Sequence, residues 1–207
     1  MKHFLAVISA IVIIFCLAAC QEVHTSPGTL YIKPAELTDQ EKKIAQLLGA
    51  DTSSPIFDFC LDASAKSVQI NTYELVDGKW NLISGGGGCQ LSKAMGRIAL
   101  EFEKIPEGLR TAIQCGNDFS ASSYKSDNKL DTTGMGYGTS ILSNFTELEY
   151  DKEIGLAVQM FNDAQQGIRM YGTEYFNSPE EYEKLGYDHV YAISIMFSQK
   201  SVGELSS

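Results

Sequence analysis

Histidine is scarce in this sequence of 207 residues: there are three, and only His24 and His189 lie beyond the first twenty positions. A serine or cysteine hydrolase needs a base beside its nucleophile and a third group that orients the base. Asp188-His189 with a serine such as Ser140 could supply these groups, but neighbours on a strand point to opposite faces. No Gly-x-Ser-x-Gly motif surrounds any serine. We therefore expect no catalytic triad and assign no catalytic residue.

Motifs that hold metals or cofactors are also missing. There is no Cys-x-x-Cys pair and no pair of histidines at ligand spacing, as transition-metal sites would require. Asp127-Asn128 and Asp131 could suggest calcium, but the segment lacks the glycine and the closing glutamate of an EF-hand loop. Glycine-rich residues 85–88 and the polar region 116–138 do not open a helix with a lysine, as phosphate-binding loops do. We expect no metal and no cofactor, and we interpret both stretches as loops between strands.

Positive charge is in short supply. The chain has 16 lysine and arginine residues against 26 aspartate and glutamate residues, for a formal charge of −10. Binding to nucleic acid requires clustered basic side chains that displace counterions from phosphates. Anionic lipid headgroups would not attract such a surface either. Nucleic acid is therefore not expected as a partner, and any contact with a membrane should depend on a covalent anchor.

Only one long apolar run is present, at the start of the chain. Met1-Lys2-His3 forms a short positive end, and the sixteen residues 4–19 are apolar except for Ser9. A transmembrane helix needs about 20 apolar residues, and this run is followed by polar Gln21-Glu22 rather than by a basic flank. Residues 1–19 are therefore predicted to be a signal peptide.

The end of this run carries a family resemblance. Leu17-Ala18-Ala19-Cys20 resembles the lipobox of bacterial lipoproteins, and the resemblance covers residues 1–20 alone. It implies that Cys20 receives a diacylglyceryl group, becomes the mature N-terminus and anchors the chain to a cell membrane, facing outside the cytoplasm. Two acyl chains make a durable anchor, whereas one does not. The alternative is an ordinary secretory signal, but Cys16-Leu17-Ala18 and Leu17-Ala18-Ala19 fit an Ala-x-Ala cleavage site poorly.

Two short helices are predicted after a flexible tether. Residues 20–34 hold two prolines and a glycine without sustained periodicity, which is typical of a tether. Thr38-Asp39-Gln40-Glu41 is a capping box that should begin a helix, with Gly49 as its left-handed end. Ser178-Pro179-Glu180-Glu181 should begin a second helix of about two turns that ends at Gly186.

Most of the remaining sequence alternates apolar and polar residues, as half-buried strands do. Strands are predicted around residues 57–61, 68–76, 98–102, 109–115, 148–150, 154–161, 168–175 and 189–197. Asp77-Gly78 should form a tight hairpin turn, and residues 154–161 are expected to pair with residues 168–175. The pattern favours an antiparallel β-sandwich with two short helices, and an α+β layered fold is the alternative. Residues 35–200 would form this single domain, and residues 201–207 a tail.

Three cysteines remain after Cys16 is removed with the predicted signal peptide and Cys20 is assigned to lipid, so at most one disulfide can form within the mature chain. We favour Cys89 with Cys115, because both lie at loop edges beside an expected hairpin, while Cys60 lies inside a strand. Three reduced thiols are the alternative. Cys60 as a catalytic thiolate is less well supported, because no histidine or helix N-terminus is assigned to lower its pKa.

Acidic side chains are the remaining catalytic candidates. Asp58 and Asp62 share a strand face, and Glu147, Glu149 and Asp151 share another. Paired carboxylates about 5 to 9 Å apart could hydrolyse glycosides. An acidic sequence produces such pairs on any exposed sheet face, so solvated surface is the simpler interpretation.

A candidate binding face is formed by Arg169, Tyr171 and Tyr175, which would share one face of the predicted strand 168–175. Exposed aromatic side chains often bind sugars or protein partners; the alternative is that this face belongs to the core. Two hypotheses on function remain. We favour a non-catalytic envelope lipoprotein that binds a ligand or a protein partner, over an envelope hydrolase with a site built from scattered acids.

Overall fold

The computed structural model describes residues 28–47, 54–85, 88–126, 131–163, 167 and 169–205. The predicted signal peptide, Cys20, most of the predicted tether with His24, Gly49 and Asp127-Asn128 lie outside these residues. No helix of the described ranges is both long and apolar enough to span a membrane.

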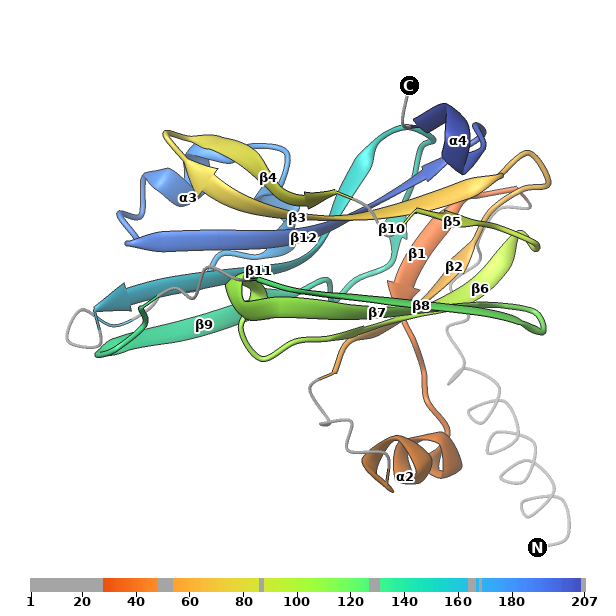
Figure 1. Ribbon diagram of the computed structural model, residues 1–207, viewed down its shortest axis with the longest axis horizontal. Coiled ribbons are helices and arrows are strands. Elements are labelled where there is room, and N and C mark those ends of the chain that lie inside the picture. Colours follow the sequence, from red (N-terminus) through yellow and green to blue (C-terminus); the bar gives the residue numbers. More distant parts are fainter. Residues whose placement is uncertain are drawn as a thin grey trace, which may run out of the picture.

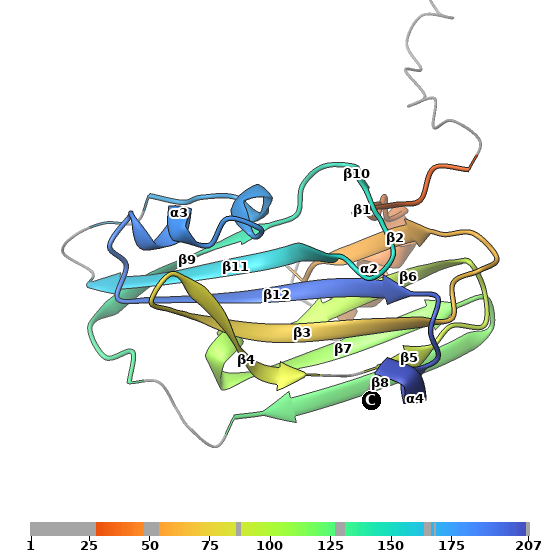
Figure 2. The same cartoon turned by 90° about the horizontal axis from the view of Figure 1, so that it is seen from above.

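Two antiparallel sheets lie face to face, as Figures 1 and 2 show. Sheet A has the order β10 (Thr146–Glu147), β1 (Tyr31–Pro34), β2 (Ile56–Cys60), β6 (Met95–Glu101), β7 (Gly108–Cys115), β8 (Asp118–Lys125). Sheet B has the order β4 (Lys79–Gly85), β3 (Ser67–Val76), β12 (His189–Ser198), β11 (Glu153–Asp163), β9 (Met135–Ile141), and β5 (Cys89–Gln90) also pairs with β3. The predicted β-sandwich is confirmed.

Helices are short and peripheral. The described residues contain α2 (Asp39–Leu47), α3 (Glu180–Glu183) and α4 (Val202–Leu205), and the 3-10 turns η1 (Ile105–Glu107) and η2 (Thr173–Tyr175). The first predicted helix is confirmed. The second is one turn long rather than about two, because the chain after Glu183 turns until Gly186, whose φ of 68° is left-handed as expected.

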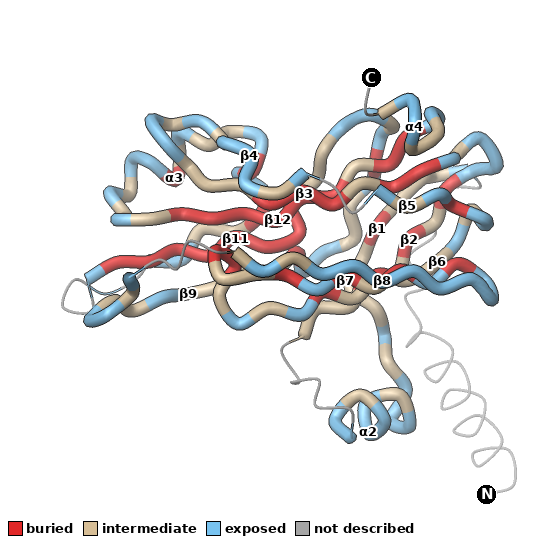
Figure 3. The backbone as a smooth tube through the Cα atoms, viewed as in Figure 1, coloured by how far each residue is buried: buried red, intermediate tan, exposed pale blue. Residues whose placement is uncertain are grey.

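The core between the sheets follows from the alternation in the sequence. Phe57 and Phe59 of β2, Ile98 of β6 and Ile193 of β12 are buried in it. Figure 3 shows the buried backbone concentrated where the sheets face each other. The alternation of apolar and polar residues identified β2, β3, β6, β7 and β12, because each of these strands turns one face to this core. The predicted hairpin is confirmed too: Val76 pairs with Lys79, and Asp77 and Gly78 have positive φ.

One buried polar side chain fastens the two sheets together. Gln159 of β11 is fully buried, and its Oε1 accepts a hydrogen bond of 2.8 Å from the backbone N–H of Ile105. Its Nε2 donates to the carbonyl of Glu103 and to Thr139 Oγ1, both at 2.9 Å. Since Glu103 and Ile105 belong to the connection between β6 and β7, the amide joins sheet B to sheet A with all its groups bonded.

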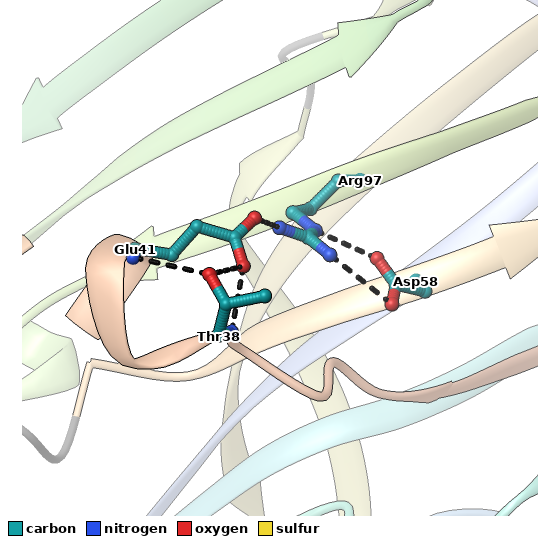
Figure 4. A network of polar contacts seen from close by, with 4 residues as sticks. All are labelled: Thr38, Glu41, Asp58 and Arg97. Atoms are coloured by element: carbon teal, nitrogen blue, oxygen red, sulfur yellow. Dashed lines mark hydrogen bonds and ion pairs between the residues drawn. The ribbon is translucent and has the colours of Figure 1, made fainter.

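Helix α2 is attached to sheet A through its capping box, which Figure 4 shows from close by. Thr38 N–H donates to Glu41 Oε2 at 2.7 Å, and Glu41 N–H donates to Thr38 Oγ1 at 3.3 Å, as predicted. Arg97 of β6 bridges Glu41 Oε1 at 2.8 Å and Asp58 Oδ1 at 2.7 Å. The Thr38 hydrogen bonds and Arg97 together lower the pKa of Glu41 to about 2.

Four predictions about the strands and tether are wrong. Residues 116–138, expected to be a loop, contain β8 and the start of β9. Strand β8 is exposed on both faces at the edge of sheet A, and β9 contains Gly136 and Gly138, so neither shows an apolar period of two. Residues 148–150 form no strand. The tether ends earlier than expected, because Tyr31–Pro34 form β1 between β10 and β2 with Ile32 buried.

The fourth correction concerns the predicted strand 168–175. Strand β11 pairs with β12 on one side and with β9 on the other, so it has no free edge for that segment. The described residues of 167–175 form coil and η2 instead, and η2 and α3 lie over the outer face of sheet B (Figure 2). There they cover the outward-facing side chains of β11 and β12, namely Val158, Met160, Val190 and Ala192.

Candidate functional site

A large cavity lies beside the start of β11. It has a volume of about 950 Å³ and is bounded by the β9–β10 connection, the turn before β11, and the η2 segment. Its lining is mostly polar and includes Ser140, Ser143, Asn144, Thr146, Glu147, Glu149, Lys152, Glu153, Glu174 and Asn177. This volume is typical of small-molecule sites.

One wall is fixed by the turn between β10 and β11. Asp151 has a φ of 60°, its N–H donates to the carbonyl of Phe197 at 2.8 Å, and its carboxylate accepts a hydrogen bond of 2.6 Å from Ser198. Leu148 N–H donates to the carbonyl of Leu30 at 3.0 Å. The turn is therefore tied both to β12 and to the chain just before β1.

The opposite wall is fixed by aromatic packing. Gly155 permits Phe176 to pack directly on β11, because a Cβ there would lie 2.7 Å from Phe176 Cβ. Trp80 stacks on Phe176 at 5.5 Å between ring centroids and donates from Nε1 to the Phe176 carbonyl at 2.8 Å. Tyr182 donates to the carbonyl of Gly172 at 2.6 Å. The wall is thus held by ring contacts and hydrogen bonds rather than by a strand ladder.

Negative charge dominates the lining. Four glutamates and one lysine face the cavity, and Lys152 is already paired with Glu149 at 2.6 Å. Glu147, Glu153 and Glu174 have no basic partner within 4.0 Å among the described residues. The formal charge of the cavity is therefore about −3 when all carboxyls are ionised, which favours a cationic ligand.

Glu153 is the glutamate whose position is fixed by hydrogen bonds. Its Oε1 accepts from Asn71 Nδ2 at 2.5 Å and from Tyr73 OH at 2.6 Å, both on β3. Gln69 Nε2 donates to Asn71 Oδ1 at 3.0 Å. Burial first, and then the hydrogen bond to Glu153, raise the pKa of Tyr73 well above its usual value, so its phenol remains a donor. Both bonds use the same carboxylate oxygen.

Ser194 of β12 lies next to this group. It pairs in register with Asn71 of β3 and with Gly155 of β11, so its side chain projects from the same face of sheet B. The residue is 0% exposed, and its Oγ has no hydrogen-bond partner among the described residues. The Ser194 hydroxyl also lowers the pKa of Tyr73 slightly against these larger effects, and Ser194 itself is not among the residues that line the cavity.

The acidic candidates from the sequence are only partly brought together. Glu147 and Glu149 line the cavity, and Asp151 supports its wall. Asp58 is ion-paired with Arg97 on the outer face of sheet A. Asp62 accepts hydrogen bonds from Ser64 and Tyr150, and mainly the Ser64 bonds lower its pKa. Asp58 and Asp62 therefore form no carboxylate pair.

The possible triad is not assembled. Ser140 lines the large cavity, whereas Asp188 and His189 line a separate pocket of about 140 Å³ near Tyr182. His189 Nδ1 lies 3.9 Å from Glu74 Oε1, and Asp188 accepts from the N–H of Asp163 at 3.0 Å. The histidine thus interacts with a carboxylate from β3 and not with a serine.

The predicted binding face of Arg169, Tyr171 and Tyr175 is wrong in its geometry, because these residues are not on a strand. Tyr171 and Tyr175 stack at 5.0 Å between centroids and both contact Tyr182, while the Arg169 carbonyl accepts from Tyr187 OH. The rings support the outer layer over sheet B instead of forming a flat aromatic face or part of the core between the sheets.

Cysteines and metal ligands give no further site. Cys60, Cys89 and Cys115 carry free thiols in the structure, with Cys115 buried and the other two half-buried, and the Cys89–Cys115 disulfide stays a prediction for oxidising conditions. Within the described part of the chain, no group of three or more histidine, cysteine, aspartate or glutamate side chains is placed to hold a metal.

Sequence reasoning missed Asn71, Tyr73, Glu153, Glu174 and Ser194. One signal was present: Gln69, Asn71 and Tyr73 put three polar side chains on one face of a strand whose other face begins with Val68 and Ile70. The partner of that face could not be named without the strand order. The chain matches no known protein-family model, no curated protein and no solved structure.

Proposed function

We propose that this chain is an envelope lipoprotein, anchored through Cys20 and facing outside the cytoplasm, that binds a small positively charged ligand without chemical turnover. The observation that carries the proposal is the cavity of about 950 Å³ with four glutamates and a single lysine that is already ion-paired. Unpaired carboxylates on low-dielectric walls concentrate cations and attract them over several ångströms.

The anchor rests on the resemblance of Leu17-Ala18-Ala19-Cys20 to a lipobox. The described chain begins at Gly28, eight residues after Cys20, and reaches β1 at Tyr31. A tether this short would keep the domain near the membrane surface, where it could retain ligands that cross the envelope.

The hydrolase alternative is less well supported. Asp58 is neutralised by Arg97, and Asp151 is used to hold a turn. Catalysis by a pair of carboxylates needs one acid whose pKa is raised, whereas the pKa values of Glu41 and Asp62 are lowered by their hydrogen bonds.

Ligand binding is tested by calorimetric titration of the mature domain with spermidine, lysine-containing peptides and acidic peptides of equal length. Cationic ligands should bind, and the double substitution Glu147→Gln, Glu174→Gln should weaken their binding about tenfold or more. Glu101→Gln is the matched control, because Glu101 is a surface glutamate on sheet A paired with Arg110. Binding of acidic peptides alone would contradict the proposal.

The anchor is tested in cells by Cys20→Ser. The variant should remain unprocessed or leave the membrane fraction, and mass spectrometry of the natural chain should find a lipidated N-terminal peptide that begins at Cys20. A soluble mature chain that begins at another residue would refute the anchor without affecting the binding site.

A further inference from the structure

We propose that the outer face of sheet A, together with α2, rests on the bilayer that holds the lipid anchor, and that Ile44 and Leu47 of α2 insert between the headgroups and the acyl chains. This inference rests on the proposed function, since it requires the anchor on Cys20. It goes beyond that proposal, because it names the surface of the domain that faces the membrane.

Helix α2 exposes two large aliphatic side chains. Ile44 is 57% exposed and Leu47 is 86% exposed. None of the residues of α2, all of which the structure describes, is buried, so the helix adds nothing to the core. Lys42 and Lys43 are exposed on the same helix. Aliphatic side chains without a protein partner, next to lysines, are typical of a helix that lies in the interface of a membrane.

Ion pairs fix the orientation of α2 on sheet A. Arg97 binds Glu41 at 2.8 Å and Asp58 at 2.7 Å (Figure 4), and Figure 1 shows α2 on the side of sheet A that is turned away from sheet B. Successive helical residues are separated by about 100°, so Ile44 and Leu47 lie beside the flank that carries Glu41 and not beneath it. The aliphatic side chains are therefore held at the exposed surface of this layer.

The outer face of sheet A carries two more exposed apolar side chains. Met95 lies two residues before Arg97 on β6, so both side chains project to the same face. Phe119 of β8 pairs with Gln114 of β7, which pairs with Arg97. Met95 and Phe119 are both exposed. The apolar contribution of this surface thus extends from α2 across the sheet.

This surface is also the part of the domain that an anionic bilayer does not repel. Its charged side chains, from the outer positions of sheet A, from residues 35–38 and from α2, number six of each sign: Lys33, Lys42, Lys43, Arg97, Arg110 and Lys125, with Glu36, Asp39, Glu41, Asp58, Glu101 and Glu147. Six minus six gives a formal charge of zero. The chain from Cys20 onward has 15 basic against 26 acidic residues, or −11, so the excess negative charge lies elsewhere, where it would oppose contact with anionic headgroups.

The length of the tether brings this surface within reach of the bilayer. The described chain begins at Gly28, eight residues after Cys20. An extended chain spans at most about 3.5 Å per residue, so Gly28 lies within about 28 Å of the lipidated cysteine. The next element is β1, which belongs to sheet A and leads directly into α2. The sheet joined to the anchor is therefore the one whose outer face is neutral and partly apolar.

The test uses the natural lipidated chain, purified from membranes and reconstituted into phosphatidylcholine vesicles, and two variants that each add one tryptophan. Leu47→Trp reports on α2. Leu82→Trp is the matched control, because Leu82 is 56% exposed and lies on β4 of sheet B. Trp80 is the one tryptophan of the natural chain and gives the baseline emission.

Quenching by brominated acyl chains measures insertion. Leu47→Trp should lose about half or more of its added emission in brominated vesicles, because apolar side chains of interfacial helices lie about 5–10 Å inside the boundary of headgroups and acyl chains. Leu82→Trp should keep its added emission. Thermal melts identify a variant that fails to fold, and Ile44→Trp is the second reporter on the same side of α2.

The outcomes separate the two proposals. If mass spectrometry finds no lipid on Cys20, the proposed anchor fails and the membrane-facing surface fails with it. If the chain is lipidated and Leu47→Trp is quenched no more than Leu82→Trp, the anchor stands and the membrane-facing surface is wrong. Protection of the added tryptophan from acrylamide without quenching by brominated lipid would show that a second copy or another protein covers α2, which would also overturn the inference.

Discussion

At the scale of single residues, Gln159 shows how one polar side chain can specify the way two sheets pack. Substitution by methionine keeps its approximate length and removes three hydrogen bonds, which leaves the buried N–H of Ile105 without a partner. Each buried polar group left without a hydrogen-bond partner lowers the free energy of unfolding by roughly 1–3 kcal/mol. We expect Gln159→Met to lower the free energy of unfolding by about 3 kcal/mol, measured by urea denaturation with an unchanged m-value.

Gln114 provides the matched control for that experiment. It is an exposed glutamine on β7, so Gln114→Met should change stability by less than about 0.5 kcal/mol. Equal effects at both positions would mean that the bonds of Gln159 contribute no net stability.

Glu41 allows a prediction on pH at the same scale. Its folded pKa of about 2 lies below the ordinary value of 4.5, first because Thr38 N–H donates to it and then because Thr38 Oγ1 and Arg97 do. A carboxyl whose pKa is lower in the folded chain than in the unfolded chain stabilises the fold at pH values above its unfolded pKa. This stabilisation is lost as the pH falls through the folded pKa. Hydrogen exchange of α2 should therefore quicken between about pH 4.5 and 2, relative to a pH-matched peptide.

Glu41→Gln removes this titration. The variant should show weaker protection of α2 at neutral pH and little further loss of protection down to pH 2. If the pH profile of α2 is the same in the variant and the natural chain, another group controls the stability of the helix.

At the scale of elements, the predictability of each strand depends on what covers it. The apolar period of two identified β2, β3, β6, β7 and β12, because each presents one face to the core. It missed β8, which is polar and exposed on both faces, and β9, where glycines interrupt the pattern. It also assigned β11 the wrong partner, because strand β11 is buried on both faces and its neighbours come from distant parts of the chain.

The cysteine prediction also belongs to the elements, since Cys89 begins β5 of sheet B and Cys115 ends β7 of sheet A. The chain after Cys89 runs beside the end of β7: Ser92 Oγ donates to the Cys115 carbonyl at 3.3 Å, and the side chain of Lys93 contacts Gly116. Burial and then the nearby Cys89 raise the pKa of the Cys115 thiol. A disulfide here would link the two sheets and close a 27-residue loop, which would add roughly 3.5 kcal/mol.

We expect non-reducing peptide mapping of protein recovered from an oxidising compartment to contain a peptide joining Cys89 to Cys115. The oxidant would be a disulfide-donating oxidoreductase or a small-molecule disulfide, which is itself reduced to thiols. Reduction should lower the melting temperature of the natural chain and of Cys60→Ser, but not that of Cys89→Ser. Three alkylatable thiols in the unreduced natural protein would rule out the bond.

At the scale of the whole molecule, the sandwich was predictable and the binding site was not. Fold class follows from local alternation and turn signals, which are present along the chain. The cavity instead depends on the β9–β10 connection, the start of β11 and the η2 segment coming together. The position of Glu153 depends on Asn71 and Tyr73, which lie some 80 residues earlier in the chain. Glu147 and Glu149 could be recognised as an acidic run, but their placement opposite Glu174 required the path of the chain over sheet B.

The position of β1 leads to a prediction about the boundary between the tether and the domain. Strand β1 lies between β10 and β2, its Ile32 is 0% exposed, and Leu30 receives the N–H that holds one cavity wall. Removing it would expose two strand edges and take a whole isoleucine from the core, which alone costs about 2–5 kcal/mol. Deletion of residues 21–34 should therefore lower the melting temperature by 10 °C or more, on the order expected for such a loss. Deletion of residues 21–27 alone should leave the melting temperature nearly unchanged, because these residues precede β1. Calorimetry of the two truncated chains measures both melting temperatures. Equal melting temperatures would mean that the domain begins after β1, against the sheet order.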